Sequence, residues 1–412
     1  MSDQRHAAIV TIGSELVEGL RIDTNSAEVA HDLSRFGFRV AEATSVGDDA
    51  SLLGVVLKRL TSTYELVVVT GGLGPTHDDV TREATAAALG LEMRSDPAIV
   101  EFLQPFVSRH KDPSSAEQVL TQALTLAGAQ VLMPTNGTAP GQIVPTPAGR
   151  VVLLPGPPSE MRPMLRRVLS GFSATRAEPR DLGVAGMPES DVQNAAQRAL
   201  EGRDGIELTV LAKPGDVRVL LLDMGAGESG ISAAARAVAR ELGDACYATD
   251  GTSLAETLVR LATERTVTLA VAESCTGGMV SAAITDVVGA SAVFLGGAVT
   301  YANEAKMELL DVLPGVLAQF GAVSEETARS MALGARERFG ADVCVSVTGI
   351  AGPDGGSADK PVGLVWFGVE SQVGGPHATQ THSLYSGGSR PSIRARATAN
   401  VLDLMRREVL RA

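Results

Sequence analysis

Residues 66–89 read Leu-Val-Val-Val-Thr, then Gly-Gly-Leu-Gly-Pro-Thr-His-Asp-Asp-Val-Thr, then Arg-Glu-Ala-Thr-Ala-Ala-Ala-Leu. The β-branched run at 66–70 is typical of a buried strand, and the alanine-rich run at 82–89 is typical of a helix. A glycine-rich polar loop joins the two. The runs that come before it alternate between strand and helix patterns: 7–12, 24–35, 39–45 and 51–61. This alternation predicts a parallel, doubly wound α/β domain.

The same alternation returns in the last third of the chain, which predicts a second domain of this class. Strand-like runs at 205–211 and 217–223 lie between the two domains and are joined by a turn sequence, Ala212-Lys-Pro-Gly-Asp. We therefore expect two doubly wound α/β domains, at residues 1–172 and 251–412. A small α+β module, at residues 173–250, joins them.

Composition limits the class of protein. The chain has 412 residues, of which 44% are hydrophobic and 20% charged, as in a soluble globular protein of several domains. The formal net charge of −13 argues against a nucleic-acid partner. No apolar run reaches the roughly 18 residues of a membrane span, and the N-terminus carries no signal-peptide pattern. Three scattered cysteines predict neither disulfides nor a zinc site, so we expect a cytoplasmic protein.

Three glycine-rich polar loops follow strand-like runs in the C-terminal domain, at 273–278, 300–306 and 348–356. Ligand sites of open α/β sheets lie outside the carboxyl ends of the strands, so these loops are expected to converge on one pocket. Ser274 could attack a carbonyl there, with the oxyanion held by neighbouring backbone amides. The other polar candidates of this domain are Thr276, Tyr301, Lys306, Thr348, Asp354 and Lys360.

Each of these residues also has a structural interpretation. Ser274 could be a helix cap. Cys275 is either a rival nucleophile or a small core residue. Lys306 is a solvated surface charge, a phosphate ligand or the group that activates the serine. Because the three loops contain no histidine, a Ser-His-Asp triad is disfavoured, and Ser-Lys or Ser-Tyr activation is left.

In the N-terminal domain, the loop at 70–81 has the character of a phosphate or pyrophosphate cradle. Its glycines let the backbone approach a ligand closely. Asp78 and Asp79 could hold Mg²⁺, which takes one or two carboxylates together with substrate oxygens. The alternative is a tight turn into a helix whose acidic first turn suits the helix dipole. Further polar loop residues are Glu15, Asn25, Asp48, Gly156 and Glu160.

The longest motifs together resemble the CinA (competence/damage-inducible protein) family. In the N-terminal half they are Gly13-Ser-Glu-Leu, Val69-Thr-Gly-Gly-Leu-Gly-Pro-Thr-His-Asp-Asp-Val-Thr, Asn136-Gly-Thr-Ala-Pro-Gly and Leu154-Pro-Gly-Pro-Pro-Ser-Glu-Met. In the C-terminal half they are Ala272-Glu-Ser-Cys-Thr-Gly-Gly, Gly296-Gly-Ala-Val-Thr-Tyr-Ala-Asn-Glu-Ala-Lys, Gly321-Ala-Val-Ser-Glu-Glu and Val347-Thr-Gly-Ile-Ala-Gly-Pro-Asp-Gly-Gly. The resemblance covers essentially the whole chain.

The resemblance implies two hydrolytic activities and a homodimer. The C-terminal domain is similar to nicotinamide-nucleotide amidohydrolase, which converts nicotinamide mononucleotide (NMN) to nicotinate mononucleotide and ammonia in pyridine-nucleotide salvage. The N-terminal domain is similar to molybdopterin-binding domains. In this family it is associated with cleavage of ADP-ribose at the pyrophosphate, with Mg²⁺ or another divalent cation.

The resemblance also implies roles for individual residues. In the C-terminal domain, which needs no cofactor, the expected catalytic residues are Ser274, Tyr301, Lys306 and Thr348. Its expected substrate-binding residues are Cys275, Thr276, Gly277, Gly278, Gly349, Gly352 and Lys360. The expected ligand-binding residues of the N-terminal domain are Asn25, Thr70, Gly71, Gly72, Gly74, Thr76 and Gly156, and its expected metal ligands are Glu15, Asp48, Asp78, Asp79 and Glu160.

Two alternatives remain open. In the first, the N-terminal domain is a non-catalytic molybdopterin- or nucleotide-binding module, and only the C-terminal domain is an enzyme. In the second, which the family's name suggests, the protein is a scaffold in DNA uptake or repair. The acidic balance of the chain weighs against direct contact with DNA.

Overall fold

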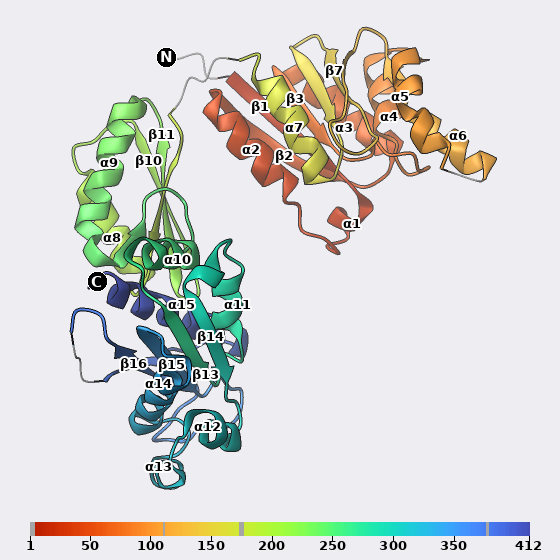
Figure 1. The fold of residues 1–412 in the computed structure, drawn as a ribbon. Coiled ribbons are helices and arrows are strands. Elements are labelled where there is room, and N and C mark those ends of the chain that lie inside the picture. Colours follow the sequence, from red (N-terminus) through yellow and green to blue (C-terminus); the bar gives the residue numbers. More distant parts are fainter. Residues whose placement is uncertain (1–4, 110–111, 173–176, 376–378) are drawn as a thin grey trace. The chain divides into compact units, whose positions relative to one another are not determined.

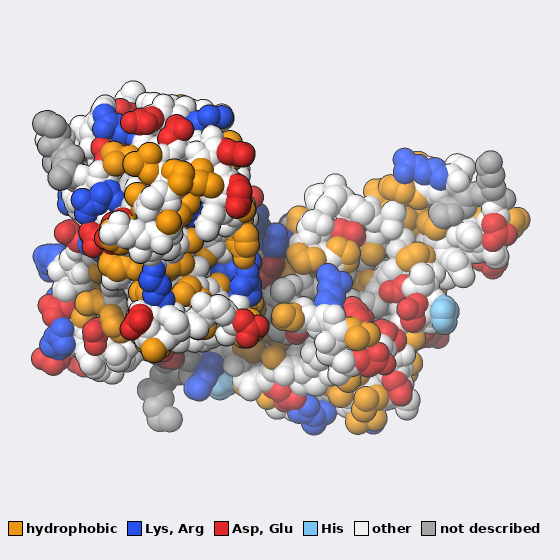
Figure 2. Space-filling model, turned by 90° about the horizontal axis from the view of Figure 1, so that it is seen from below, with side chains coloured by type: hydrophobic (Ala, Val, Ile, Leu, Met, Phe, Trp, Pro, Cys, Tyr) orange, Lys and Arg blue, Asp and Glu red, His pale blue; other side chains and the backbone are white. Residues whose placement is uncertain are grey.

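The computed structural model describes residues 5–109, 112–172, 177–375 and 379–412 (Figure 1). They form two compact units, divided between Ala177 and Glu178. Within the described ranges, no helix combines the length and the hydropathy needed to cross a membrane. On the face drawn in Figure 2, acidic and basic side chains are interspersed with hydrophobic ones.

The first unit is built around a six-stranded sheet of order β2-β1-β3-β8-β7-β6. The strands from β2 to β8 are parallel, and β7 and β6 are antiparallel additions at one edge. Its elements are β1 (Arg5–Ile12), α1 (Ser14–Val17), α2 (Asn25–Arg35), β2 (Phe38–Val46), α3 (Ala50–Thr63), β3 (Leu66–Thr70), α4 (Thr81–Leu89), β4 (Met93–Ser95), α5 (Pro97–Val107), α6 (Pro113–Thr121), β5 (Leu124–Leu126), β6 (Gln130–Leu132), β7 (Gly141–Pro145), β8 (Arg150–Leu154) and α7 (Pro158–Leu169).

Helices cover both faces of this sheet. Val67 and Val69 of β3 pack in the cluster that includes Leu57 of α3, whereas Val68 packs in the cluster that includes Leu165 of α7. Figure 1 shows α2 and α7 on one face and α3 and α4 on the other. A strand buried on both faces reads as a continuous apolar run, which is the pattern of residues 66–69. The predicted doubly wound α/β class is confirmed.

The second unit contains two sheets. The first, of order β10-β11-β9-β12, is antiparallel, and α8 and α9 pack on it. Its elements are β9 (Arg180–Val184), α8 (Glu189–Leu200), β10 (Ile206–Lys213), β11 (Asp216–Asp223), α9 (Gly227–Leu242), the 3-10 turn η1 (Gly243–Ala245) and β12 (Cys246–Ala248). The buried guanidinium of Arg406, in the last helix of the chain, donates to the carbonyl of Asp244 at 2.7 Å and ties this part to the rest of the unit.

The other sheet of this unit has the order β14-β13-β15-β16-β17. β14, β13 and β15 are parallel, whereas β16 and β17 are antiparallel to their neighbours. The elements are α10 (Leu254–Arg265), β13 (Leu269–Glu273), α11 (Met279–Thr285), η2 (Ala290–Ala292), β14 (Phe294–Val299), α12 (Asn303–Leu310), α13 (Pro314–Phe320), α14 (Glu325–Phe339), β15 (Val343–Gly349), β16 (Leu364–Ser371), β17 (Gln380–Tyr385) and α15 (Arg390–Val409).

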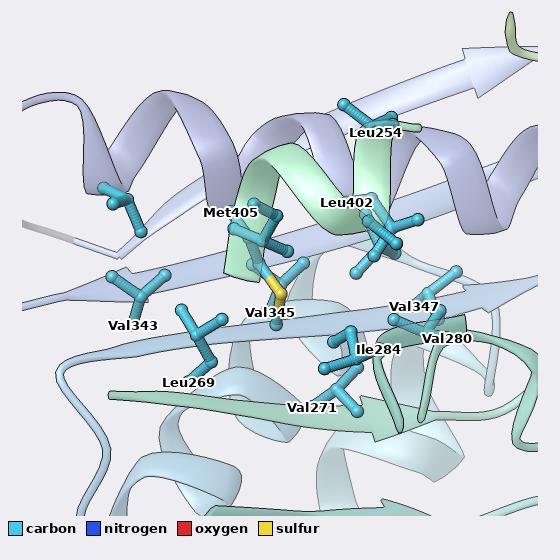
Figure 3. Close-up of a cluster of buried hydrophobic side chains, with 14 of the residues drawn as sticks. Leu254, Leu269, Val271, Val280, Ile284, Val343, Val345, Val347, Leu402 and Met405 are labelled. Atoms are coloured by element: carbon cyan, nitrogen blue, oxygen red, sulfur yellow. The ribbon is translucent and has the colours of Figure 1, made fainter. Parts of the chain in front are cut away.

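A single apolar layer fixes the strands that lead to the C-terminal loops. Figure 3 shows Val271 of β13 and Val345 of β15 in one cluster with Ile284 of α11 and Met405 of α15, two helices that cover the same face of the sheet. Each of these four side chains is completely buried. Because burying an aliphatic side chain of this size contributes roughly 1.5–3 kcal/mol, this layer holds β13 and β15 rigidly beside each other.

Candidate functional site

Both α/β sheets reverse their strand order beside their first strand. β1 lies between β2 and β3, and β13 lies between β14 and β15. The crevice outside the carboxyl ends of the strands at such a reversal is where ligands of open α/β sheets bind. The candidate loops of the sequence follow β1, β2, β3 and β8 in the first sheet and β13, β14 and β15 in the second, so the fold brings them to these two crevices.

Ser274 directly follows β13. Its amide donates to the carbonyl of Val347 at 2.9 Å and so continues the pairing of β13 with β15. Helix α11 begins only at Met279, and its N-cap residue is Gly278 rather than Ser274. In the described chain, the hydroxyl of Ser274 accepts no hydrogen bond from the amides of the first helical turn. The alternative that Ser274 is a helix cap is therefore wrong, and its hydroxyl is left for another partner.

The start of α11 is instead capped by Glu273, which the sequence analysis missed. Its fully buried carboxylate accepts from the amides of Gly278, Val280 and Ser281 at 2.9, 3.1 and 2.8 Å, and from the hydroxyl of Ser281 at 2.7 Å. A carboxylate also suits the positive end of the helix dipole. The available signal was an acidic residue at the end of an apolar strand, directly before a glycine-rich turn.

The partner of the Ser274 hydroxyl is Lys306 of α12. Its Nζ lies 3.2 Å from Ser274 Oγ, 2.8 Å from the carbonyl oxygen of Thr300 and 3.2 Å from that of Tyr301. The side chain of Lys306 is only 1% exposed, so the alternative of a solvated surface charge is wrong. The sequence analysis left open which group adjoins the serine, and the structure places Lys306 there.

Burial lowers the pKa of Lys306, although the nearby Cys275 and Glu304 act in the opposite direction. A neutral lysine amine has two N–H donors and one lone pair. If the two backbone carbonyls take the donors, the lone pair is left for the hydroxyl proton of Ser274. The arrangement therefore suits Lys306 as a general base, because the proton it would remove is already within hydrogen-bond reach.

Cys275 is placed poorly for attack. Its side chain is 6% exposed, and burial raises the pKa of its thiol to about 11. Since the thiolate is the nucleophilic form, a thiol with this pKa is unreactive near neutral pH. The geometry favours the interpretation of Cys275 as a small core residue.

The amides expected to hold an oxyanion are mostly engaged already. The amide of Gly277 donates to the carbonyl of Ser274 at 3.1 Å, and that of Gly278 donates to Glu273. The prediction that the amides beside Ser274 hold the oxyanion is therefore wrong for Gly277 and Gly278, because both amides form hydrogen bonds within the turn. The amide of Thr276 has no acceptor in the described part of the chain, and the buried Thr276 Oγ1 also lacks a partner there.

Two arginines from the first turns of α15 reach these loops, and the sequence analysis missed both. Arg394 donates to the carbonyls of Cys275 and Thr276 at 3.0 and 2.6 Å. Arg390 donates to the carbonyl of Gly352 at 2.8 Å and to the hydroxyl of Tyr301 at 2.9 Å. They bring positive charge to the edge of the site. Their sequence signal was faint, since basic residues in a terminal helix usually face solvent.

Three further predicted residues of this domain, Thr348, Lys360 and Gly349, make contacts within the loops and not with Ser274 or Lys306. The hydroxyl of Thr348 donates to the carbonyl of Ala322 at 2.7 Å. The ammonium of Lys360 donates to the carbonyl of Phe320 at 2.5 Å. Gly349 lies at the end of β15, where an added Cβ would come within 2.8 Å of Val365. These contacts hold the loop in place, so direct roles in binding remain predictions.

The N-terminal crevice is a cavity of about 490 Å³. Among the predicted residues, all but Thr76 line it: Glu15, Asn25, Asp48, Thr70, Gly71, Gly72, Gly74, Asp78, Asp79, Gly156 and Glu160. Gly71 has φ 102°, and a Cβ there would lie 2.5 Å from the carbonyl oxygen of Ile12. Only glycine lets β3 turn this closely past β1. The side-chain amide of Asn25 joins the walls by donating to Thr70 Oγ1 at 3.2 Å and to the carbonyl of Gly156 at 2.8 Å.

Asp79 closes the loop that follows β3. Its carboxylate accepts from the amides of Gly74 and Thr76, each at 2.8 Å, and from the hydroxyl of Thr76 at 2.5 Å. The same loop rests on Arg82, which is 2% exposed and donates to the carbonyls of Leu73 and Gly74 at 2.8 and 3.0 Å. Asp79 and Thr76 therefore shape the loop, and Arg82 is a buried cation beneath it that sequence reasoning missed.

The described residues include no group of three or more His, Cys, Asp or Glu side chains close enough to hold a metal ion by themselves. The donor set nevertheless fits Mg²⁺, which binds through one or two carboxylates plus substrate phosphates. Burial raises the pKa of Glu160, with no cation acting to lower it. Asp48 accepts from the amide of Ser14 at 2.9 Å and so is partly engaged. A cation that arrived with a phosphate ligand would supply the missing positive charge.

Two family models match the chain. Residues 251–409 match the CinA C-terminal domain, and residues 8–174 match a model described as "Probable molybdopterin binding domain". Similar full-length relatives include CinA-like proteins of Thermotoga maritima and Akkermansia muciniphila. They are 35% and 38% identical, each over 98% of this chain and 98% and 99% of their own lengths.

Solved structures similar to parts of the chain bear related names. The competence/damage inducible protein CihA of Agrobacterium tumefaciens is 41% identical, with a TM-score of 0.35, and the match covers 37% of this chain and 94% of that one. The CinA superfamily protein of Enterobacter cloacae is 30% identical, with a TM-score of 0.35, over 39% of this chain and 96% of that one.

Proposed function

Because this chain belongs to the CinA family, we propose that its C-terminal domain hydrolyses the carboxamide of NMN to nicotinate mononucleotide and ammonia. The observation that carries the proposal is the 3.2 Å separation of Lys306 Nζ and Ser274 Oγ in a buried site. Carboxamide hydrolysis needs an activated nucleophile and a proton for the departing ammonia, and this pair supplies both.

The first half of the reaction forms an ester. Neutral Lys306 takes the proton of Ser274 as Oγ attacks the carboxamide carbon. The negative charge that develops on the carbonyl oxygen is stabilised by the amide of Thr276, which has no acceptor in the described chain. Lys306, now an ammonium, returns the proton to the amide nitrogen. The carbon–nitrogen bond breaks, and ammonia leaves.

The second half reverses the roles. Water attacks the ester carbon while Lys306 removes a proton from the water. The bond between the ester carbon and Ser274 Oγ then breaks, and Lys306 gives its proton back to the serine. The product is the carboxylic acid of nicotinate mononucleotide, which releases its proton to solvent and becomes the carboxylate. Lys306 ends the cycle neutral, as its lowered pKa favours.

The substrate also carries a phosphate, and the start of α15 offers a place for it. Arg390 and Arg394 each use part of the guanidinium to hold loop carbonyls and keep further N–H groups for a ligand. The positive end of the dipole of this 20-residue helix adds to the attraction for an anion. Tyr301, which accepts from Arg390, adjoins the same edge.

The test is ammonia release from NMN by the full chain. We expect the wild type to release one ammonia for each nicotinate mononucleotide formed, and Ser274→Ala to fall to background. Cys275→Ala, which truncates the neighbouring side chain, is the matched control and should retain most of the activity. Undiminished release by Ser274→Ala would remove the serine as nucleophile, and no release by the wild type would remove the proposed reaction.

For the N-terminal domain we propose cleavage of ADP-ribose at its pyrophosphate. The cavity beside the glycine loop, with carboxylates along its wall, supports this choice. Asp78, Glu15 and Glu160 would hold a divalent cation, which would neutralise pyrophosphate charge and position its oxygens. The loop from Gly71 to Gly74 lets the phosphates come close to the backbone, and buried Arg82 places positive charge behind it.

This second activity is decided by ADP-ribose turnover with and without MgCl₂. We expect AMP and ribose 5-phosphate to form only with the cation. Binding of ADP-ribose with no turnover at any concentration of Mg²⁺ or Mn²⁺ would favour the alternative, a binding module. The NMN reaction, which has its own site, should proceed in the presence of EDTA.

A further inference from the structure

A cavity of about 390 Å³ lies in the second unit, where the β10-β11-β9-β12 sheet meets α15. It is lined by the loop from β9 to α8, by the turn from β10 to β11, and by Arg396 and Asn400 of α15. Its volume is within the range of small-molecule sites, which occur preferentially at boundaries between domains. None of the catalytic or loop residues described above lines this cavity, so the function proposed above does not explain it.

The cavity is a hollow in a packed contact. A Cβ added to Gly215, in the turn from β10 to β11, would come within 2.6 Å of the Cβ of Ala399, so the turn rests directly on α15. Further along this helix, Arg406 donates to the carbonyl of Asp244 at 2.7 Å. These two contacts hold the small sheet against α15, and the cavity between them keeps a shape that a ligand can recognise.

The side chains that line the cavity combine apolar surface with positive charge. Val217, which is 5% exposed, and Leu384 of β17 contribute apolar surface. Two cations, Lys213 and Arg396, stand against a single acid, Glu189. This excess of positive charge is local, because the chain as a whole has a formal net charge of −13. The lining therefore favours an amphipathic anion, which has an apolar body and a carboxylate, sulfonate or phosphate group.

Both cations have hydrogen-bond donors to offer to such a group. The ammonium of Lys213 makes no hydrogen bond or ion pair in the described part of the chain. The guanidinium of Arg396 gives one N–H to the carbonyl of Gly387 at 3.1 Å and has others left, since arginine carries five. An anion can therefore accept hydrogen bonds in the cavity without displacing an existing ion pair.

Arg396 also connects the cavity with the catalytic loops of the C-terminal site. Its partner Gly387 lies in the segment that leads into α15, directly before the N-cap residue Ser389. The next residue, Arg390, donates to the hydroxyl of Tyr301 at 2.9 Å and to a loop carbonyl. An anion held by Arg396 therefore acts on the same end of α15 that places Arg390 beside those loops.

We propose that this cavity is an effector site for a small amphipathic anion. Its charged group binds Lys213 and Arg396, and its apolar body packs on Val217 and Leu384. By bridging the β10–β11 turn and α15, the ligand stabilises the arrangement in which Arg390 is held beside the catalytic loops, so NMN should bind more tightly in its presence. The coupling rests on the NMN hydrolysis proposed above, whereas the binding site rests on the cavity alone.

Two fluorescent probes separate the contribution of charge from that of apolar surface. Anilinonaphthalene sulfonate (ANS) carries one sulfonate, and N-phenyl-naphthylamine has the same rings without it. Titration of the full chain with each probe gives the two dissociation constants. We expect that of ANS to be at least about fivefold lower, because hydrogen bonds to a charged group are the stronger ones.

Variants assign this binding to the cavity. Ala212→Trp fills the cavity from an exposed position of β10 and should abolish the ANS binding. Leu211→Trp, at the adjacent exposed position that does not line the cavity, is the matched control and should keep it.

A change of charge gives a second, milder variant, which decides if Ala212→Trp fails to fold. Lys213→Gln should weaken ANS by roughly threefold and leave the neutral probe unchanged. Lys58→Gln, which changes an exposed lysine of α3, should alter neither. Equal affinity of the wild type for the two probes, or full ANS affinity in both Ala212→Trp and Lys213→Gln, overturns the proposal.

The coupling is measured as the KM for NMN with and without saturating ANS. We expect KM to fall by at least about twofold, with kcat unchanged, and this response to be lost in Ala212→Trp. A KM that rises equally in the wild type and in Ala212→Trp would mean that ANS competes at the catalytic site, and would refute the coupling.

The outcomes are distinguishable from failure of the proposed hydrolysis. If the wild type releases no ammonia from NMN, the hydrolysis fails, the probe titrations still decide the binding site, and the coupling is measured from the dissociation constant of NMN instead of its KM. If ammonia is released but KM does not respond to bound ANS, the binding site stands and its control of the C-terminal reaction is refuted.

Discussion

The two crevices of this protein occupy the same place in their sheets but are built in opposite ways. In the C-terminal site the reacting groups already touch, because Lys306 is buried against Ser274 and held by two carbonyls. In the N-terminal cavity the carboxylates line the wall without forming a metal cage in the described chain. One site is assembled by folding, and for the other we propose that a bound ligand completes it. Burial explains the difference, since one amine can be buried at modest cost when it is neutral and donates to carbonyls, whereas several ionised carboxylates close together repel one another and stay near solvent.

The sharpest test of this contrast is removal of the buried amine. Lys306→Met should lower kcat for NMN by about 10³-fold, within the usual range for loss of a general base. ADP-ribose cleavage should be unchanged. The rates of ammonia release and of AMP formation in the same preparation measure both effects.

Lys360→Met is the matched control, because this lysine also donates to a backbone carbonyl but belongs to a neighbouring loop. We expect its NMN activity to stay within about threefold of wild type. Equal losses in the two lysine variants would mean that Lys306 acts only through the fold.

The pH dependence should follow from the lowered pKa of Lys306. The ammonium form cannot accept the serine proton, so kcat/KM should rise with pH and level off once Lys306 is neutral. Because burial lowers its pKa, the midpoint should lie below the ordinary lysine value of about 10.4. Initial rates between pH 5 and 10 measure the midpoint, and a rate that falls across this range would contradict neutral Lys306 as the base.

A smaller effect is expected from the turn that carries the nucleophile. Glu273→Gln replaces a buried acceptor of four hydrogen bonds with a group that brings two N–H donors into the same place. We expect the free energy of unfolding of the C-terminal unit to fall by about 2 kcal/mol, with a loss of NMN activity. Urea denaturation followed by loss of that activity measures the change. Glu304→Gln, which changes an exposed side chain of α12, should leave the free energy of unfolding unaltered.

The smallest effect should come from the loop of the open site. Asp79→Asn weakens the contacts that close the loop at Gly74 and Thr76, and should lower the stability of the N-terminal unit by about 1 kcal/mol. Asp78→Asn is its neighbour and control. It should keep the melting temperature but raise the Mg²⁺ concentration needed for half-maximal ADP-ribose cleavage. If Asp79→Asn changes the Mg²⁺ requirement and not the stability, Asp79 is a metal ligand after all.

Much of the architecture followed from local patterns. The apolar run at 66–70 and the loop after it predicted a strand that turns tightly into a helix, because a strand covered on both faces must be apolar throughout. The positions of the polar loops directly after strands predicted that their residues lie close together, since the carboxyl ends of parallel strands share one edge of the sheet. The antiparallel direction of β16 and β17 was not foreseen, because a strand's own residues do not encode the direction of its neighbour.

Residues whose role depends on distant partners were the ones missed. Glu273 was indistinguishable in sequence from any acid beside a turn, and Arg390 and Arg394 from surface charges of a final helix. Arg82 likewise gave no sign that a buried cation would hold the loop before it. Each is defined by carbonyls or amides that reach it only after folding.

The sequence by itself determined the α/β class, the family motifs and the loops that carry the chemistry, because strand and helix periods and glycine turns are local properties. Only the tertiary structure decided which group faces Ser274. Lys306 lies 32 residues further along the chain. Its contact with the serine, its burial and its lowered pKa all arise from the packing of α12 against the carboxyl end of β13, and burial is a property of the folded chain alone.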